Sequence, residues 1–233
     1  MTAAPQRRRG PRPPPRRAPP RRARRPSRTR RRPRNAAARV AARAPLDGFA
    51  AGETLARIGS VRFPAPGFFA DAALEPAGPE PTSGLDAWVE RCLREGNAAG
   101  HLSADERGRL LRYAERVTPD LTALAGARHL VHGDYNPKNL VAGPGGGVAA
   151  VLDWEFAFSS TPLFDVANML REPRPPGFAD AFVTGFTAGG GELPGDWRHL
   201  CRALDLFSLA DLLTRPPGHR YFAKAIRHVK RLL

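Results

Sequence analysis

Several residue types that define whole classes of protein are scarce in this sequence. Two cysteines, Cys92 and Cys201, stand far apart among 233 residues, and there is no Cys-x-x-Cys pair and no Cys/His cluster. This argues against a disulfide framework and against a structural zinc site. No segment approaches the roughly 18 consecutive apolar residues of a membrane span, and no apolar stretch of a secretory signal follows the arginine-rich start. We therefore expect a cytoplasmic protein without a membrane segment.

Lysine is also scarce, and acidic residues are missing from the start of the chain. The sequence has 34 Arg but only 3 Lys, and residues 1–45 contain 17 Arg, 10 Pro and no Asp or Glu. The other 188 residues carry 20 basic and 22 acidic side chains, so the formal net charge of +15 comes from the first 45 residues. These 188 residues have an ordinary composition and are numerous enough to bury a hydrophobic core.

We interpret residues 1–45 as a disordered Arg/Pro-rich arm, because like charges repel one another and few large apolar side chains are available to bury. Three explanations of the arm stay open. It could bind an anionic polymer, it could be a transit-like leader, or it could come from a wrongly assigned start or reading frame. The arm has no aromatic residue that could stack on bases, which makes nucleic acid a poor candidate partner.

Downstream of the arm, an irregular pattern gives way to a helical one. Residues 46–82 are rich in Gly, Pro and Phe and show no sustained period, so we predict an irregular lead-in. From residue 83 the apolar period is helical, and it predicts a helix over about 85–98 and a second helix that ends at Pro119. Two capping-box patterns mark the predicted starts of these helices: Ser83 with Asp86, and Ser103 with Glu106.

The pattern then changes to that of short strands before it becomes helical again. Apolar runs at 129–131 and 140–142 flank a polar loop, and a third run at 148–152 follows a glycine-rich turn. We predict that the last two runs pair as a hairpin. Further helices are predicted at about 165–171, 178–188, 196–214 and 219–232. Residues 83–233 therefore make a mostly helical α+β unit.

The loop between the first two strands carries a pattern typical of phosphoryl transfer. It reads His132-Gly133-Asp134, with Asn139 five residues after the aspartate, and Asp153 follows the second hairpin strand. This chemistry needs one carboxylate to take the proton of the attacking hydroxyl and separate oxygen ligands to hold Mg²⁺ against the nucleotide phosphates. Asp134 suits the first role, and Asn139 and Asp153 suit the second.

Three segments carry a resemblance to a known family: LVHGDYNPKNLV, VLDWEFA and PLFDVANMLR. With them the sequence resembles the aminoglycoside phosphotransferase (APH) family, which includes choline-kinase-like and other small-molecule kinases. The resemblance implies a protein-kinase-like C-terminal lobe over residues 83–233, ATP or GTP as phosphate donor, Mg²⁺ as cofactor and a small-molecule hydroxyl as acceptor. It also implies that Asp134 is the catalytic residue, that Asn139 and Asp153 are the Mg²⁺ ligands, and that Asp165 braces the catalytic loop.

Other polar residues of these segments have simpler interpretations. We interpret His132 as a residue that structures the loop through backbone hydrogen bonds. Asp165 could equally be the N-cap of the helix that follows it, a role compatible with bracing the loop. Glu155 could be a metal neighbour or a solvated residue. Lys138 could contact a phosphate, but we favour a solvated side chain.

The resemblance also draws attention to parts that are missing. A kinase fold has an N-terminal lobe with a glycine-rich loop and a strand lysine that contact the phosphates. Residues 1–82 contain no G-x-G-x-x-G and no lysine, so the residues that bind the nucleotide stay unassigned and we expect the N-terminal lobe to be missing. This favours a wrongly assigned start for the arm. We expect weak activity from this polypeptide, with a non-catalytic kinase-like fragment as the alternative.

The sequence says little about the substrate. Residues 179–233, which help form the substrate side in the family, carry 8 basic and 5 acidic residues. A polycationic aminoglycoside would prefer an acidic pocket, so this balance favours a neutral or anionic alcohol. The oligomeric state is not predicted.

Overall fold

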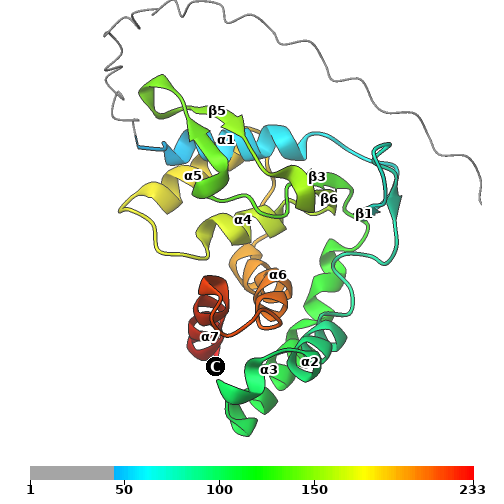
Figure 1. Ribbon diagram of the computed structural model, residues 1–233. Coiled ribbons are helices and arrows are strands. Elements are labelled where there is room, and N and C mark those ends of the chain that lie inside the picture. Colours follow the sequence, from blue (N-terminus) through cyan, green and yellow to red (C-terminus); the bar gives the residue numbers. More distant parts are fainter. Residues whose placement is uncertain (1–44) are drawn as a thin grey trace, which may run out of the picture. The chain divides into compact units, whose positions relative to one another are not determined.

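The computed structural model describes residues 45–233, which belong to one compact unit, Ala41–Leu233 (Figure 1). The disorder expected for residues 1–45 therefore falls, except for Pro45, outside the described residues. The unit combines helices with two small antiparallel sheets, which confirms the predicted α+β class. Within the described range, no helix is long and apolar enough to cross a membrane.

The helices of the unit follow the predicted ones closely, with one addition at the start. Six of them, α2 to α7, match the predicted ranges to within a few residues. The helices are α1 (Gly48–Gly59), α2 (Leu85–Glu95), α3 (Ala104–Val117), α4 (Leu163–Leu170), α5 (Phe178–Ala188), α6 (Trp197–Leu212) and α7 (Arg220–Leu232). Helix α6 packs against α2, α4 and α7, and its buried leucines form much of the core.

One of the two predicted capping boxes forms and the other does not. Ser103 accepts the Glu106 N–H at 3.1 Å, and the Glu106 carboxylate accepts the Ser103 N–H at 2.7 Å. The Ser83 box is wrong, because α2 is preceded by Gly84 in the left-handed region with φ 67°. The Ser83 hydroxyl instead donates to the Glu80 carbonyl at 2.7 Å. The Asp86 N–H is satisfied from a distant segment by the Thr118 hydroxyl at 3.2 Å.

The predicted irregular lead-in at 46–82 is wrong for a large part of its length. It contains α1 and two short strands, β1 (Gly67–Phe69) and β2 (Pro76–Ala77). Figure 1 shows α1 beside α5, and the two helices are in contact along their lengths. The prediction rested on the Gly, Pro and Phe content and the lack of a sustained period, whereas the structure places Gly48 and Gly52 at the contact between the helices.

Glycines let the backbones of α1 and α5 approach each other closely. A Cβ placed on Gly52 would lie 2.6 Å from the Phe186 nitrogen and nearer still to the Phe182 carbonyl oxygen. On the facing helix, a Cβ on Gly185 would lie 2.9 Å from the Cα of Phe49. A larger residue at either position would force the two helices apart, since neither contact is with a flexible side chain.

Two sheets position the loop that carries the motif. The first has the order β2-β1-β6-β3, with β3 at His129–Val131 and β6 at Phe158–Ser160. The second is the predicted hairpin, β4 (Leu140–Ala142) with β5 (Val148–Val151), in which Leu140 is opposite Val151. The hairpin prediction is confirmed, whereas the pairing of β3 with β6 was not foreseen. The motif loop runs from β3 to β4, so both of its ends are held by sheets.

We expect Gly52→Ala to destabilise the unit, because the added methyl group would meet backbone atoms of α5. The free energy of unfolding should fall by about 1–3 kcal/mol, as is typical of overpacking, despite the better helix propensity of alanine. Thermal denaturation measures this change. Gly195→Ala is the matched control, since its Cβ would meet nothing within 4 Å. An unchanged melting temperature in the Gly52 variant would contradict this packing.

Candidate active site

The motif loop begins with a turn that only glycine accommodates. Gly133 has φ 80°, and a Cβ at this position would collide with the carbonyl oxygen of Phe156. The loop backbone therefore lies directly against the segment that follows β5. This close approach fixes the direction in which the chain leaves Gly133, and with it the position of Asp134.

His132 is a fully buried residue that connects the loop to the hairpin. Its Nε2 lies 2.8 Å from the carbonyl oxygen of Leu152, and its Nδ1 lies 3.1 Å from the N–H of Asp134. Nδ1 accepts this N–H, so the ring carries its proton on Nε2 and donates it to Leu152. Burial lowers the pKa of His132, which is consistent with a neutral ring. Both contacts are with the backbone.

Asp165 reaches the same turn from the first turn of α4. One carboxylate oxygen accepts the His132 N–H at 2.6 Å, and the other accepts the Gly133 N–H at 2.9 Å. The residue is fully buried, and this burial raises the pKa of Asp165 to about 7. The N-cap interpretation is wrong, because α4 starts at Leu163 after Pro162 and Asp165 lies inside the helix.

The carboxylate of Asp134 is surrounded by nitrogen donors. Its Oδ1 lies 2.7 Å from the Asn136 amide nitrogen and 3.4 Å from that of Asn168. Its Oδ2 lies 3.0 Å from the Asn139 amide nitrogen and 2.8 Å from Nζ of Lys138. These contacts hold the orientation of the carboxylate, whose side chain is 21% exposed. Sequence reasoning missed the roles of Asn136 and Asn168, although both lie in the segments that carried the family resemblance.

Lys138 is exposed, as we expected of a solvated side chain, but it also has partners in the site. Besides its ion pair with Asp134, its Nζ lies 5.2 Å from the centre of the Tyr221 ring at the start of α7. Burial alone would lower the pKa of Lys138, but the hydrogen bond and the charge of Asp134 raise it above its ordinary value. Lys138 is therefore a protonated ammonium group beside the carboxylate of Asp134.

Asn139 and Asp153 lie at the same end of the hairpin. The Leu152 N–H donates to the carbonyl oxygen of Asn139 at 2.8 Å, so Asp153 directly follows the residue that pairs with Asn139. The Asn139 amide nitrogen donates to the Asp134 backbone oxygen at 2.9 Å as well as to its carboxylate. This leaves the amide oxygen of Asn139 as the atom available to a cation.

Asp153 has an unusual backbone conformation, with φ 68° and ψ 59°. A non-glycine residue in the left-handed region is uncommon, although aspartate enters it more readily than most, and such residues cluster at functional sites. Its side chain is exposed and has no hydrogen bond or ion pair with residues 45–233. The conformation therefore presents an unpartnered carboxylate next to Asn139.

The donor atoms at this end of the hairpin fit Mg²⁺ in a nucleotide complex. One amide oxygen and one carboxylate are hard ligands, and Mg²⁺ in such sites takes one or two protein carboxylates together with substrate phosphates. Across residues 45–233, no group of three or more His, Cys, Asp or Glu side chains could form a metal cage.

A cavity of about 1190 Å³ opens above these residues. Asp134, Lys138, Asp153 and Glu155 line one part of it, and Trp88 of α2 lines another. Other parts of the wall come from the end of α4 and the loop that follows it, the end of α6 and the first half of α7. The cavity exceeds the 300–1,000 Å³ of a typical single-ligand site, so it has room for a donor and an acceptor.

Comparison with known proteins places this geometry in a family. The model of the family "Phosphotransferase enzyme family" (APH) matches residues 24–200, which is most of the chain. The chain belongs to the APH phosphotransferase family. This confirms the resemblance that the three sequence segments indicated. No curated protein matches the chain in sequence.

Solved structures of other proteins share the fold of this chain. The chain is similar to a macrolide 2′-phosphotransferase type I, with a TM-score of 0.56 at 18% identity over 79% of this chain and 58% of that chain. It is also similar to a choline/ethanolamine kinase family protein from Mesorhizobium loti, with a TM-score of 0.56 at 19% identity over 79% of this chain and 60% of that chain. The chain thus spans about three fifths of these two structures.

Asp165 should make the stability of this APH chain depend on pH. Its pKa is raised from 3.8 to about 7, so between these values the folded state binds a proton that the unfolded state has lost. The contribution of Asp165 to the free energy of unfolding is then largest below about pH 4 and falls as pH rises toward 7. Denaturation by urea at several pH values should show this decline in the wild type and a flatter profile in Asp165→Asn.

The Asn variant should also be less stable at every pH. One of the two N–H groups, of His132 or Gly133, would then face an amide NH₂ group instead of an acceptor, at a cost of about 1–3 kcal/mol. Asp180→Asn is the control, because Asp180 is an exposed acid of α5. Equal pH profiles for the wild type and Asp165→Asn would contradict a raised pKa.

Proposed function

We propose that the chain is a phosphotransferase that transfers the γ-phosphoryl group of ATP or GTP to a hydroxyl group of a small molecule. The observation that carries this proposal is the position of Asp134. Its carboxylate lines the large cavity together with Asp153, on a loop braced by a buried aspartate. Family membership supports the same reaction class.

Asp134 is proposed as the group that takes the proton of the acceptor. The acceptor oxygen attacks the γ-phosphorus, a new P–O bond forms, the bond to the β,γ-bridging oxygen breaks, and ADP or GDP leaves. The hydroxyl proton passes to the carboxylate of Asp134. A carboxylate suits this role when the hydroxyl lies within about 2.6–3.2 Å of it. Asn136 and Asn168 would keep it oriented during the approach.

Asn139 and Asp153 are proposed to hold Mg²⁺ through the amide oxygen and the carboxylate. When bound, this cation would neutralise charge on the phosphate oxygens. The protein residues supply its ligands without competing contacts, since Asp153 has no partner among residues 45–233 and Asn139 uses only its amide nitrogen. The strained backbone of Asp153 is explained by this role.

Lys138 is proposed to stabilise the charge of the transferred group. The acceptor oxygen must lie within hydrogen-bond distance of Asp134, and the phosphorus must lie about 3–3.5 Å from that oxygen. Nζ of Lys138 is 2.8 Å from the same carboxylate, so the phosphoryl group would pass close to the ammonium group. Lys138 also comes first among the three lysines of the chain, none of which precedes the catalytic loop.

The polypeptide of 233 residues is expected to turn over slowly. No lysine and no G-x-G-x-x-G pattern precedes residue 138, so the phosphate contacts that such a loop and lysine provide must come from elsewhere. Removing a single charge-stabilising contact commonly costs 10²–10³-fold in rate. The lack of this loop and lysine favours the alternative to the proposed function, which is a non-catalytic kinase-like protein.

Transfer to an alcohol should depend on Asp134. The purified chain with ATP, Mg²⁺ and a panel of small alcohols should release ADP slowly but above background, as measured by a coupled assay. Asp134→Ala should lower the rate by about 10²–10⁴-fold, because the proton acceptor is lost. Asp153→Ala should do the same and raise the Mg²⁺ concentration needed for half-maximal rate. If the wild type and Asp134→Ala are equally inactive but bind ATP, the non-catalytic alternative holds.

The Lys138→Met variant should show whether Lys138 stabilises the transferred phosphoryl group or only blocks Asp134. If Lys138 stabilises the transferred phosphoryl group, kcat should fall by about 10²-fold with little change in KM for the alcohol. Lys138→Arg should recover part of the rate, since it keeps the charge. A Lys138→Met variant that is faster than the wild type would instead mean that Lys138 only blocks Asp134.

A further inference from the structure

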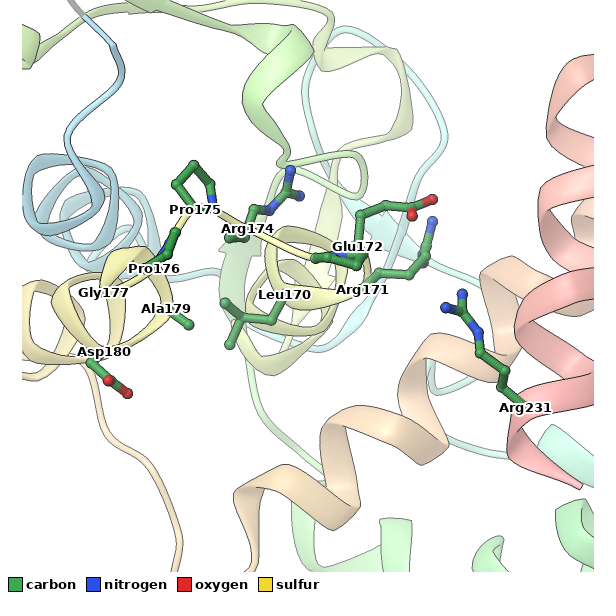
Figure 2. Close-up of a pocket in the computed structure, with 11 residues that line it drawn as sticks. Leu170, Arg171, Glu172, Arg174, Pro175, Pro176, Gly177, Ala179, Asp180 and Arg231 are labelled. Atoms are coloured by element: carbon green, nitrogen blue, oxygen red, sulfur yellow. The ribbon is translucent and has the colours of Figure 1, made fainter.

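The loop between α4 and α5 contains an arginine without a carboxylate partner. Arg174 donates from Nε to the carbonyl oxygen of Met169 at 2.7 Å. None of the Asp or Glu side chains in residues 45–233 lies within 4.0 Å of its guanidinium. The side chain is half-buried and lines both the large cavity and a second, adjoining one of about 430 Å³ (Figure 2). A partly desolvated charge of this kind normally has a partner.

The two charged residues just before Arg174 are already neutralised. Arg171 donates from Nε to both carboxylate oxygens of Asp205 on α6, at 2.7 and 3.0 Å. The carboxylate of Glu172 lies 3.4 Å from Nζ of Lys224 and 3.2 Å from Nε2 of His228. Glu172 therefore cannot serve Arg174 without leaving α7. The guanidinium of Arg174 is therefore the charged group of this loop that has no ion-pair partner among residues 45–233.

The surroundings add positive charge to that of Arg174. Arg231 of α7 points toward the same loop in Figure 2, and its guanidinium donates to Nδ1 of His228 at 2.9 Å. Asp180 also lines the small cavity, but it is exposed. Burial lowers the pKa of Arg174, with Arg171 opposing its charge further and Glu172 favouring it. An anionic ligand at the guanidinium would offset this cost of burial.

The position of Arg174 connects it to the catalytic loop. Asn168 of α4 lies 3.4 Å from the Asp134 carboxylate, and α4 ends at Leu170, shortly before Arg174. Arg174 and Asp134 line the same cavity. A ligand in this cavity could thus place a hydroxyl at Asp134 and an anionic group at the guanidinium. The planar guanidinium can bind both oxygens of a carboxylate or phosphate.

We propose that Arg174 forms an oxyanion subsite for the acceptor, so that the alcohol phosphorylated by this chain carries a carboxylate or a phosphate group. The role of this ligand as the phosphoryl acceptor rests on the proposed phosphotransferase function, whereas the binding of an anion at Arg174 does not depend on that function. Arg174 is then a binding residue that selects anionic alcohols against neutral and cationic ones. The nucleotide phosphates are the other possible source of the anion, and the experiment separates the two.

The first measurement is binding without nucleotide. Titration calorimetry with inorganic phosphate and with glycerate should show binding to the wild type that weakens about 10–100-fold in Arg174→Met, as expected for loss of a charge-assisted contact. Arg174→Lys should lie between the two. Arg215→Met is the matched control, because Arg215 lines the same cavity but is paired with Asp211 at 3.3 Å. It should change binding less than about 2-fold.

The second measurement compares acceptors and nucleotide. Glycerate, glycerol 3-phosphate, glycerol and 3-aminopropane-1,2-diol share one carbon skeleton and differ in charge. Arg174→Met should raise KM about 10–100-fold for the two anionic alcohols and leave the other two unchanged, while the Kd for ATP stays within about 2-fold. Weaker ATP binding in Arg174→Met would overturn the proposal in favour of the nucleotide as the anion.

Two further outcomes distinguish a failure of the anion subsite from a failure of the proposed phosphotransferase function. If no transfer occurs but phosphate binding depends on Arg174, the subsite stands and the phosphotransferase function of this chain falls. If the wild type and Arg174→Met bind phosphate and glycerate equally, the subsite falls whatever the activity. Circular dichroism melting of each variant checks that the loss of the contact with Met169 has not unfolded the loop.

Discussion

The turn that positions Asp134 in the candidate active site depends on one buried carboxylate. Asp165 in α4 accepts the backbone N–H groups of His132 and Gly133, and so fixes the turn from which Asp134 projects. Burying a carboxylate is costly, as the raised pKa of Asp165 indicates. The two N–H groups would be equally costly to leave unpaired in this buried turn. The buried carboxylate of α4 and the buried N–H groups of the loop therefore offset each other's desolvation.

Further contacts connect the turn at Gly133 to the hairpin and to Asp153. His132 connects the turn to the hairpin through the Leu152 carbonyl, and the hairpin brings Asp153 beside Asn139. These contacts are made by backbone groups and by buried side chains. A preorganised site of this kind is what phosphoryl transfer needs, because its catalysis comes mainly from positioning and electrostatic stabilisation.

Much of this arrangement could be predicted from the sequence, because its signals are local. The helices α2 to α7 and the hairpin follow from apolar period and turn residues, and the motif spacing singled out Asp134, Asn139 and Asp153. Helix α1 was missed because its glycines disfavour a helix in isolation, and only contact with α5 explains them. The pairing of Lys138 with Asp134 and the burial of Asp165 depend equally on the tertiary fold.

Charge within the cavity also follows from the fold and not from composition. The end at the motif loop gathers Asp134, Asp153 and Glu155, with Lys138 as the cation beside them. The end at the α4–α5 loop holds Arg174, whose neighbour Glu172 is already paired with Lys224 and His228. The charge that a pocket presents to a ligand therefore depends on which of its charged side chains already form ion pairs. A paired charge attracts a ligand far less than an unpaired one. Counting basic and acidic residues along 179–233 gave the same sign, but it could not find Arg174, which lies outside that range.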